Sequence, residues 1–105
     1  MADRDLLAVM RSWVDQRGHE ALFQPWLVYR ETVQDSWSKR AALIEFEDPS
    51  TMGQVTVWDT GECEVDLGST TDPARTLIRS IQVSSGEQLI QTLEEAVTFC
   101  QANSP

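Results

Sequence analysis

The chain has 105 residues, of which 41% are hydrophobic and 24% charged, and it carries a formal net charge of −9. This length suits one domain, residues 1–105, and no apolar run approaches the roughly 18 residues that a membrane-spanning helix needs. The amino-terminal segment has no apolar stretch of the kind found in signal peptides, so we expect a cytoplasmic protein.

The acidic side chains are concentrated in the second part of the sequence. Residues 1–40 hold six acidic and six basic side chains, whereas residues 41–105 hold eleven acidic side chains against Arg75 and Arg79. Such a charge distribution repels nucleic acid and anionic membranes, and it attracts basic partners. Acidity can also serve only to keep a small protein soluble, and the charge by itself leaves both explanations open.

Amphipathic patterns predict one helix near each end of the chain. From Asp3 to Gln16 apolar residues recur with a helical period, and Arg17-Gly18 supplies stop signals. Ser85 and Gln88 have the spacing of a capping box, which predicts the start of the second helix. The expected apolar stripes are Leu6, Val9, Met10, Trp13 and Val14 in the first helix, and Leu89, Leu93, Ala96, Val97 and Cys100 in the second.

Five strands are predicted between these helices, from runs of alternating or β-branched residues that end at polar turns. The predicted strands are Trp26–Val33, Ala41–Glu47, Met52–Trp58, Cys63–Leu67 and Thr76–Val83. In the first strand the pattern does not decide which side chains face the core: either Trp26 and Val28, or Leu27 and Tyr29. In the last, Ile81 and Val83 are the clearest inward pair.

The third and fourth strands are expected to form a hairpin. A two-residue loop would mix valines with carboxylates on both faces, so we predict a loop with an odd number of residues, Thr60-Gly61-Glu62. That loop pairs Val57 with Val65 and Val55 with Leu67. Gly61 would supply a positive φ at little cost.

The order of elements, α-β-β-β-β-β-α, predicts an α+β fold. Short connections favour a mainly antiparallel five-stranded sheet, and both terminal helices can bury their apolar stripes on one face of it. The other face would then be open and would combine an aromatic side chain with carboxylates. Trp58 could also tuck under a loop at its strand end, and this alternative stays open.

Motifs for catalysis or metal binding are weak. His19 is the single histidine and has no nucleophile arrangement around it, and Cys63 and Cys100 lack the spacing of zinc ligands. Both cysteines sit at apolar positions of their elements, so we expect buried free thiols in preference to a disulfide. The carboxylates of Glu64 and Asp66 lack the carbonyl-rich loop that Ca²⁺ sites use. We therefore expect a protein that is not an enzyme and has no cofactor and no metal.

The run from Gly53 to Leu67, GQVTVWDTGECEVDL, combines a tryptophan, a short glycine-bearing turn and an acidic strand. In this it resembles the core of small bacterial immunity proteins of the TriTu-like group, which neutralise polymorphic toxins delivered between competing cells. The similarity extends to the helix that contains Trp13 and to the helix that opens at Ser85. The resemblance implies a non-enzymatic inhibitor made alongside its toxin. Members of the group are associated with an ADP-ribosyltransferase toxin that acts on elongation factor Tu.

The leading hypothesis is an immunity protein, a monomer or weak dimer, whose acidic sheet face binds a basic toxin domain and neither nucleic acid nor membrane. An aromatic anchor surrounded by complementary charge is typical of protein interfaces. The candidate partner-binding residues are Trp58, Glu62, Glu64 and Asp66, with Asp59, Glu45 and Glu47 as supporting charge. The alternative is a small acidic secretion chaperone or adaptor that holds a client protein in the cytoplasm. Such chaperones are dimeric and usually expose apolar grooves, which no strand pattern here indicates.

Overall fold

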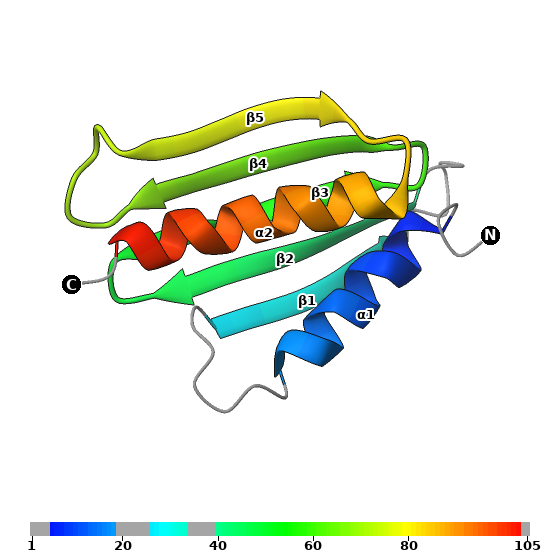
Figure 1. Cartoon of the computed structure of the whole chain (residues 1–105), viewed down its shortest axis with the longest axis horizontal. Coiled ribbons are helices and arrows are strands. Elements are labelled where there is room, and N and C mark those ends of the chain that lie inside the picture. Colours follow the sequence, from blue (N-terminus) through cyan, green and yellow to red (C-terminus); the bar gives the residue numbers. More distant parts are fainter. Residues whose placement is uncertain (1–4, 19–25, 34–39, 104–105) are drawn as a thin grey trace.

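Five antiparallel strands form one sheet in the order β1-β2-β3-β4-β5, and a helix lies at each end of the chain (Figure 1). The computed structural model describes residues 5–18, 26–33 and 40–103. The elements are α1 (Leu6–Gly18), β1 (Trp26–Val33), β2 (Arg40–Asp48), β3 (Thr51–Trp58), β4 (Glu62–Ser69), β5 (Thr76–Gln82) and α2 (Gly86–Asn103). The predicted α+β fold and its order of elements are confirmed.

Both helices pack on the same face of the sheet, α2 across its middle and α1 beside it (Figure 1). The predicted stripe of α2 is fully buried, and α1 buries Leu7 in addition to Leu6, Met10 and Trp13. From the sheet, the buried side chains beneath the helices are Ala42, Ile44, Phe46, Val55, Val57, Cys63, Val65 and Leu67. The core is therefore a single layer between helices and sheet.

The amino-terminal ends of both helices are capped by polar side chains. The backbone N–H of Ala8 donates to Oδ1 of Asp5 at 3.1 Å, so α1 begins at Leu6 with Asp5 as its cap, later than the predicted start at Asp3. At α2 the N–H of Gln88 donates to Oγ of Ser85 at 3.2 Å, as predicted. The Gln88 side chain accepts from the N–H of Ser84 at 2.8 Å.

The β3–β4 hairpin corrects the predicted register. Val57 pairs with Cys63 and Val55 with Val65, so the three-residue loop is 59–61 and the predicted pairs are wrong by two residues. The odd loop length is correct, and a shift by two leaves every side chain on its predicted face. Gly61 has a φ of 100°, which confirms the predicted positive φ.

The structure also decides between the alternatives for β1. Leu27 and Tyr29 pack against the core, opposite Phe46 and Ile44 of β2. Val28 therefore lies on the face of the sheet that is turned away from the helices. Ile81 and Val83 point inward as expected, although β5 ends one residue before Val83.

Candidate functional site

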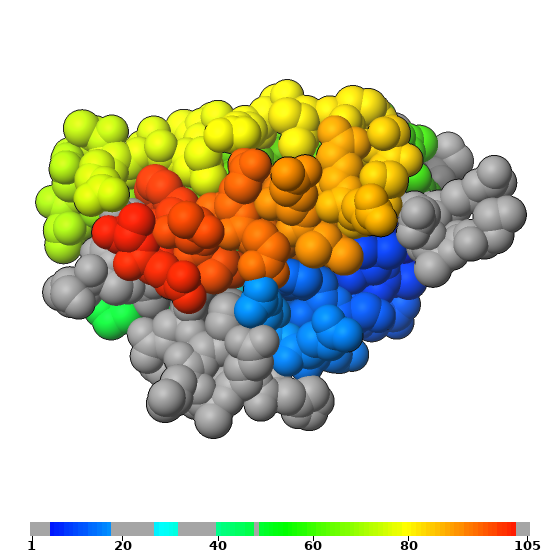
Figure 2. All heavy atoms as spheres, viewed as in Figure 1, coloured from blue at the N-terminus to red at the C-terminus, as the bar shows by residue number. Residues whose placement is uncertain are grey.

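The face of the sheet opposite α1 and α2, here called the open face, gathers most of the carboxylates of the strands. In the described part of the chain neither helix lies on it, and Figures 1 and 2 view the molecule from the other, helix-covered side. Side chains alternate across a strand, so each residue next to a buried one points to this face. On β2, β3 and β4 the outward side chains are Ala41, Leu43, Glu45, Glu47, Met52, Gln54, Thr56, Trp58, Glu62, Glu64 and Asp66.

Six of the seven candidate residues predicted from the sequence share this face, and Asp59 does not. Asp59 lies in the β3–β4 turn, where its Oδ2 accepts a hydrogen bond from the Arg40 N–H at 3.1 Å. Its own N–H donates to the Arg40 carbonyl at 2.9 Å. Asp59 thus ties the hairpin end to the start of β2.

The pairing of the strands fixes what stands beside each carboxylate. Glu64 lies between Thr56 of β3 and Ser80 of β5, and Asp66 lies between Gln54 and Ile78. The carboxylates of β4 are therefore flanked on both sides by uncharged side chains. Directly paired residues have Cβ atoms about 5 Å apart, so these neighbours form continuous rows across the face.

Three carboxylates on the open face have no internal partner among the described residues. Glu45, on the same face, does form an ion pair: its Oε1 lies 3.5 Å from Nε of Arg30. Glu47, Glu64 and Asp66 are exposed and make no ion pair or hydrogen bond through their carboxylates within residues 5–18, 26–33 and 40–103. Their charge is available to a partner.

The open face also exposes two aliphatic side chains that were not singled out from the sequence. Met52 is 63% exposed and Ile78 is 69% exposed. The alternation of side chains along a strand could have placed both on the open face. Met52 is an even number of residues from Trp58 on β3, whereas Ile78 is an odd number of residues from the inward Ile81 on β5. Trp58 is half-buried, opposite Ala41 of β2. Apolar and acidic groups therefore mix on this face, as they do in protein interfaces.

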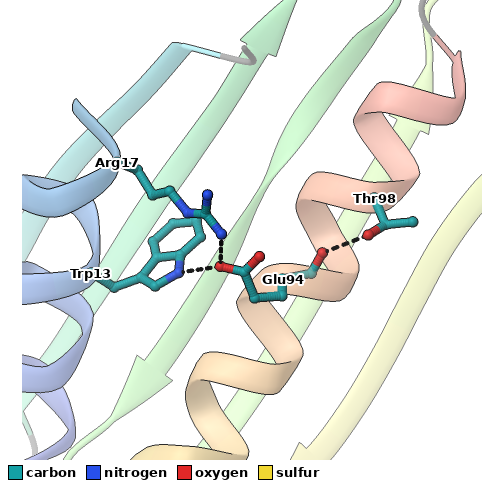
Figure 3. Close-up of polar contacts among 4 residues, drawn as sticks. All are labelled: Trp13, Arg17, Glu94 and Thr98. Carbon is teal, nitrogen blue, oxygen red and sulfur yellow. Dashed lines mark hydrogen bonds and ion pairs between the residues drawn. The ribbon is translucent and has the colours of Figure 1, made fainter. Parts of the chain in front are cut away.

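A second feature lies between the helices, where a groove of about 750 Å³ runs along Trp13, Arg17, Ile90 and Glu94. Figure 3 shows Trp13 and Arg17 both directed at the Glu94 carboxylate. Burial opposes the ionisation of Glu94, but hydrogen bonds from Arg17 and Trp13 and the charge of Arg17 outweigh it, so the pKa of Glu94 lies below its usual value. These polar groups are used to join the helices.

The remaining candidates for chemistry give no site within the described residues. Cys63 and Cys100 are buried and form no disulfide, as expected. Burial, helped by the charge of Glu64, raises the pKa of the Cys63 thiol to about 11, so it is a poor nucleophile. Between residues 5 and 103, leaving out 19–25 and 34–39, no three His, Cys, Asp or Glu side chains lie together as metal ligands would. His19 lies outside the described residues.

Comparison with models of known protein families gives a match. A family model described as "Immunity protein TriTu" matches residues 9–99, which is most of the chain. No curated protein matches it. Neither helix of the described chain is long and apolar enough to cross a membrane.

Proposed function

The chain belongs to the TriTu family of immunity proteins, and from this premise we propose that it neutralises a cognate toxin by binding the toxin domain through the open face. Binding alone, without turnover of a substrate, is sufficient for such an inhibitor. The protein would act in the cytoplasm of the cell that makes it, as a monomer or weak dimer. Members of the TriTu-like group are associated with an ADP-ribosyltransferase toxin, and we propose that the toxin neutralised by this protein belongs to the same class of enzymes.

The observation that carries the proposal is the position of Glu47, Glu64 and Asp66. All three are exposed on one face, and the described residues leave their carboxylates without ion pairs. A carboxylate that has no internal partner adds to the field that draws in a basic surface, and it adds little to the stability of the fold. The partner surface is therefore expected to be basic.

Apolar groups on the same face support binding rather than mere solubility. Met52 and Ile78 expose most of their surface, and Trp58 is half-buried at the end of β3 beside the hairpin turn. A face that served only solubility would gain nothing from these groups, since exposed aliphatic side chains favour association. In an interface these groups would bury apolar surface at either end of the β4 carboxylates.

The test is to protect cells that express a candidate toxin domain encoded by a neighbouring gene. The wild-type chain should restore growth and should be captured with the toxin at near-equal stoichiometry. Glu64→Lys with Asp66→Lys should abolish both. Asp15→Lys with Glu87→Lys makes the same change of net charge on the helix side, where both residues are exposed, and should preserve both. If only Asp15→Lys with Glu87→Lys abolished protection, the toxin would bind the helix side and the proposal would be wrong. Capture of an unfolded secreted client would instead favour the chaperone hypothesis.

A further inference from the structure

The charge of the open face is arranged in a line along β4. Glu62, Glu64 and Asp66, here called the β4 row, alternate with the buried Cys63 and Val65. Residues two apart on a strand are about 6.6 Å apart, so the row spans about 13 Å. The strands on both sides present no charge beside it, because Gln54, Thr56 and Trp58 flank it on β3 and Ile78, Ser80 and Gln82 on β5.

Apolar groups stand at both ends of the β4 row. At one end Trp58 leads into the β3–β4 turn, next to Glu62. At the other end Met52 is paired with Gly68, which has no side chain, and Ile78 is paired with Asp66. Met52 and Ile78 therefore lie on opposite sides of β4, two residues out of step with each other, and both expose most of their surface there.

These features match the dimensions of an α-helix. Four residues of a helix rise about 6 Å and eight about 12 Å, close to the spacing and length of the β4 row. A helix is about 10–12 Å wide, and β3 and β5 lie about 10 Å apart across β4. Basic residues at positions i, i+4 and i+8 would each meet one carboxylate, of which that of Glu62 also accepts a hydrogen bond from the Thr60 hydroxyl.

A strand of the partner fits this face less well. The backbone groups of β4 are already hydrogen-bonded to β3 and β5, so the face offers side chains and no free backbone ladder. An incoming strand would leave its own polar backbone without partners as water is excluded. A helix satisfies its backbone internally and packs well on a sheet, as α1 and α2 do on the opposite face.

We propose that the element of the toxin bound by this protein is an amphipathic helix that lies along β4, with Lys or Arg side chains one turn apart on the β4 row and apolar side chains on Trp58, Met52 and Ile78. The inference rests on the proposed function and adds the chemistry and shape of the partner. The toxin helix would complete a third layer on the sheet.

Photo-crosslinking of the complex tests the inference. Cys63 and Cys100 are buried, so a benzophenone maleimide will label a single introduced cysteine. The open-face positions are Gln54→Cys on β3 and Ser80→Cys on β5, and the control on the helix side is Gln91→Cys, which is exposed on α2. We expect both open-face probes to crosslink to the same toxin helix and the control to crosslink to nothing.

The possible failures are distinct. Crosslinks from Gln54→Cys and Ser80→Cys to a loop, a strand or two separate segments of the toxin would overturn the inference that the bound element is a helix. The open face would still be the binding surface. Crosslinks from Gln91→Cys alone would overturn the proposed function itself. Absence of crosslinks from both open-face probes in a complex that forms would also overturn the open face as the binding surface, because benzophenone inserts into C–H bonds of every residue type.

Single neutralisations test the line of charge independently. Glu62→Gln, Glu64→Gln and Asp66→Asn should each weaken toxin binding at least about fivefold, as charge pairs at protein interfaces do. Glu47→Gln is the matched comparison, since it removes the same charge from the same face but lies on β2, and we expect it to weaken binding less than any single change in the β4 row. An equal loss for Glu47→Gln would show that cations of the toxin do not follow β4.

Discussion

The indole Nε1 of Trp13 donates a hydrogen bond of 2.8 Å to Oε2 of Glu94, and this bond joins α1 to α2 (Figure 3). Arg17 binds the same oxygen, and its guanidinium carbon lies 5.7 Å from the centroid of the Trp13 ring. The indole also packs on Phe46 of β2, with ring centroids 6.5 Å apart. One residue of α1 therefore touches both the second helix and the sheet.

Glu94→Gln should lower the free energy of unfolding by about 1 kcal/mol at neutral pH, because it weakens two hydrogen bonds to a half-exposed carboxylate. The folded-state pKa of Glu94 is lowered from 4.5, so its contribution is present above pH 4.5 and is lost as the pH falls through the folded-state pKa. Urea unfolding at neutral and acidic pH measures the difference between wild type and variant, which should shrink on acidification.

Glu95→Gln is the control for this experiment. Its ion pair with Arg79 at 3.1 Å is half-exposed on both sides. It should change stability by about 0.5 kcal/mol or less. If both variants had the same effect, the bond between α1 and α2 would contribute nothing specific.

Gly53→Ala should prevent stable folding. Gly53 has a φ of 145°, and a Cβ built there would lie 2.0 Å from the Asp66 carbonyl oxygen and 2.7 Å from the Leu67 Cα. Backbone atoms of a central strand cannot move aside, so we expect a loss of about 3 kcal/mol or more. At Gly68, on the same sheet, the nearest atom is 3.9 Å away. Gly68→Ala should therefore retain nearly wild-type stability. Thermal unfolding measures the stability of both variants, and an equal loss of stability in the two would contradict this prediction.

The thiols of Cys63 and Cys100 should not react with thiol reagents in the folded protein. Burial raises the pKa of Cys63 from 9.0 to about 11, so the thiol stays protonated at neutral pH and is shielded from reagents. Reaction with a thiol reagent should become fast only when urea unfolds the chain. Since the folded pKa is raised, stability should also fall as the pH rises from 9 towards 11. Rapid labelling of native protein at neutral pH would contradict this.

Alternation along the strands predicted which side chains share a face, because that property survives a register error of two residues. It placed Glu45, Glu47, Glu64 and Asp66 together correctly although Val57 was paired with the wrong partner. The pairing itself depends on the conformation of the turn around Gly61, which the sequence pattern does not encode. The inward set of β1 was equally undecided, since both of its phases are apolar.

The bond between Trp13 and Glu94 could not be predicted from the sequence. The two residues are 81 positions apart, and their contact depends on how α1 and α2 lie side by side on the sheet. Asp59 is a different case, because its place at the end of the hairpin suggested a binding role, whereas its carboxylate accepts a hydrogen bond from the Arg40 backbone. A polar residue at a turn often serves the turn.

The central claim, that the open face binds the toxin, is tested most directly by the affinity of the purified toxin domain for Glu64→Lys/Asp66→Lys. Placing two cations against a basic surface should weaken binding by about 100-fold or more, most strongly at low salt. The matched pair Asp15→Lys/Glu87→Lys should bind within about threefold of wild type, because long-range charge alone changes affinity little. Unchanged affinity for the open-face pair, with both proteins folded, would contradict the account.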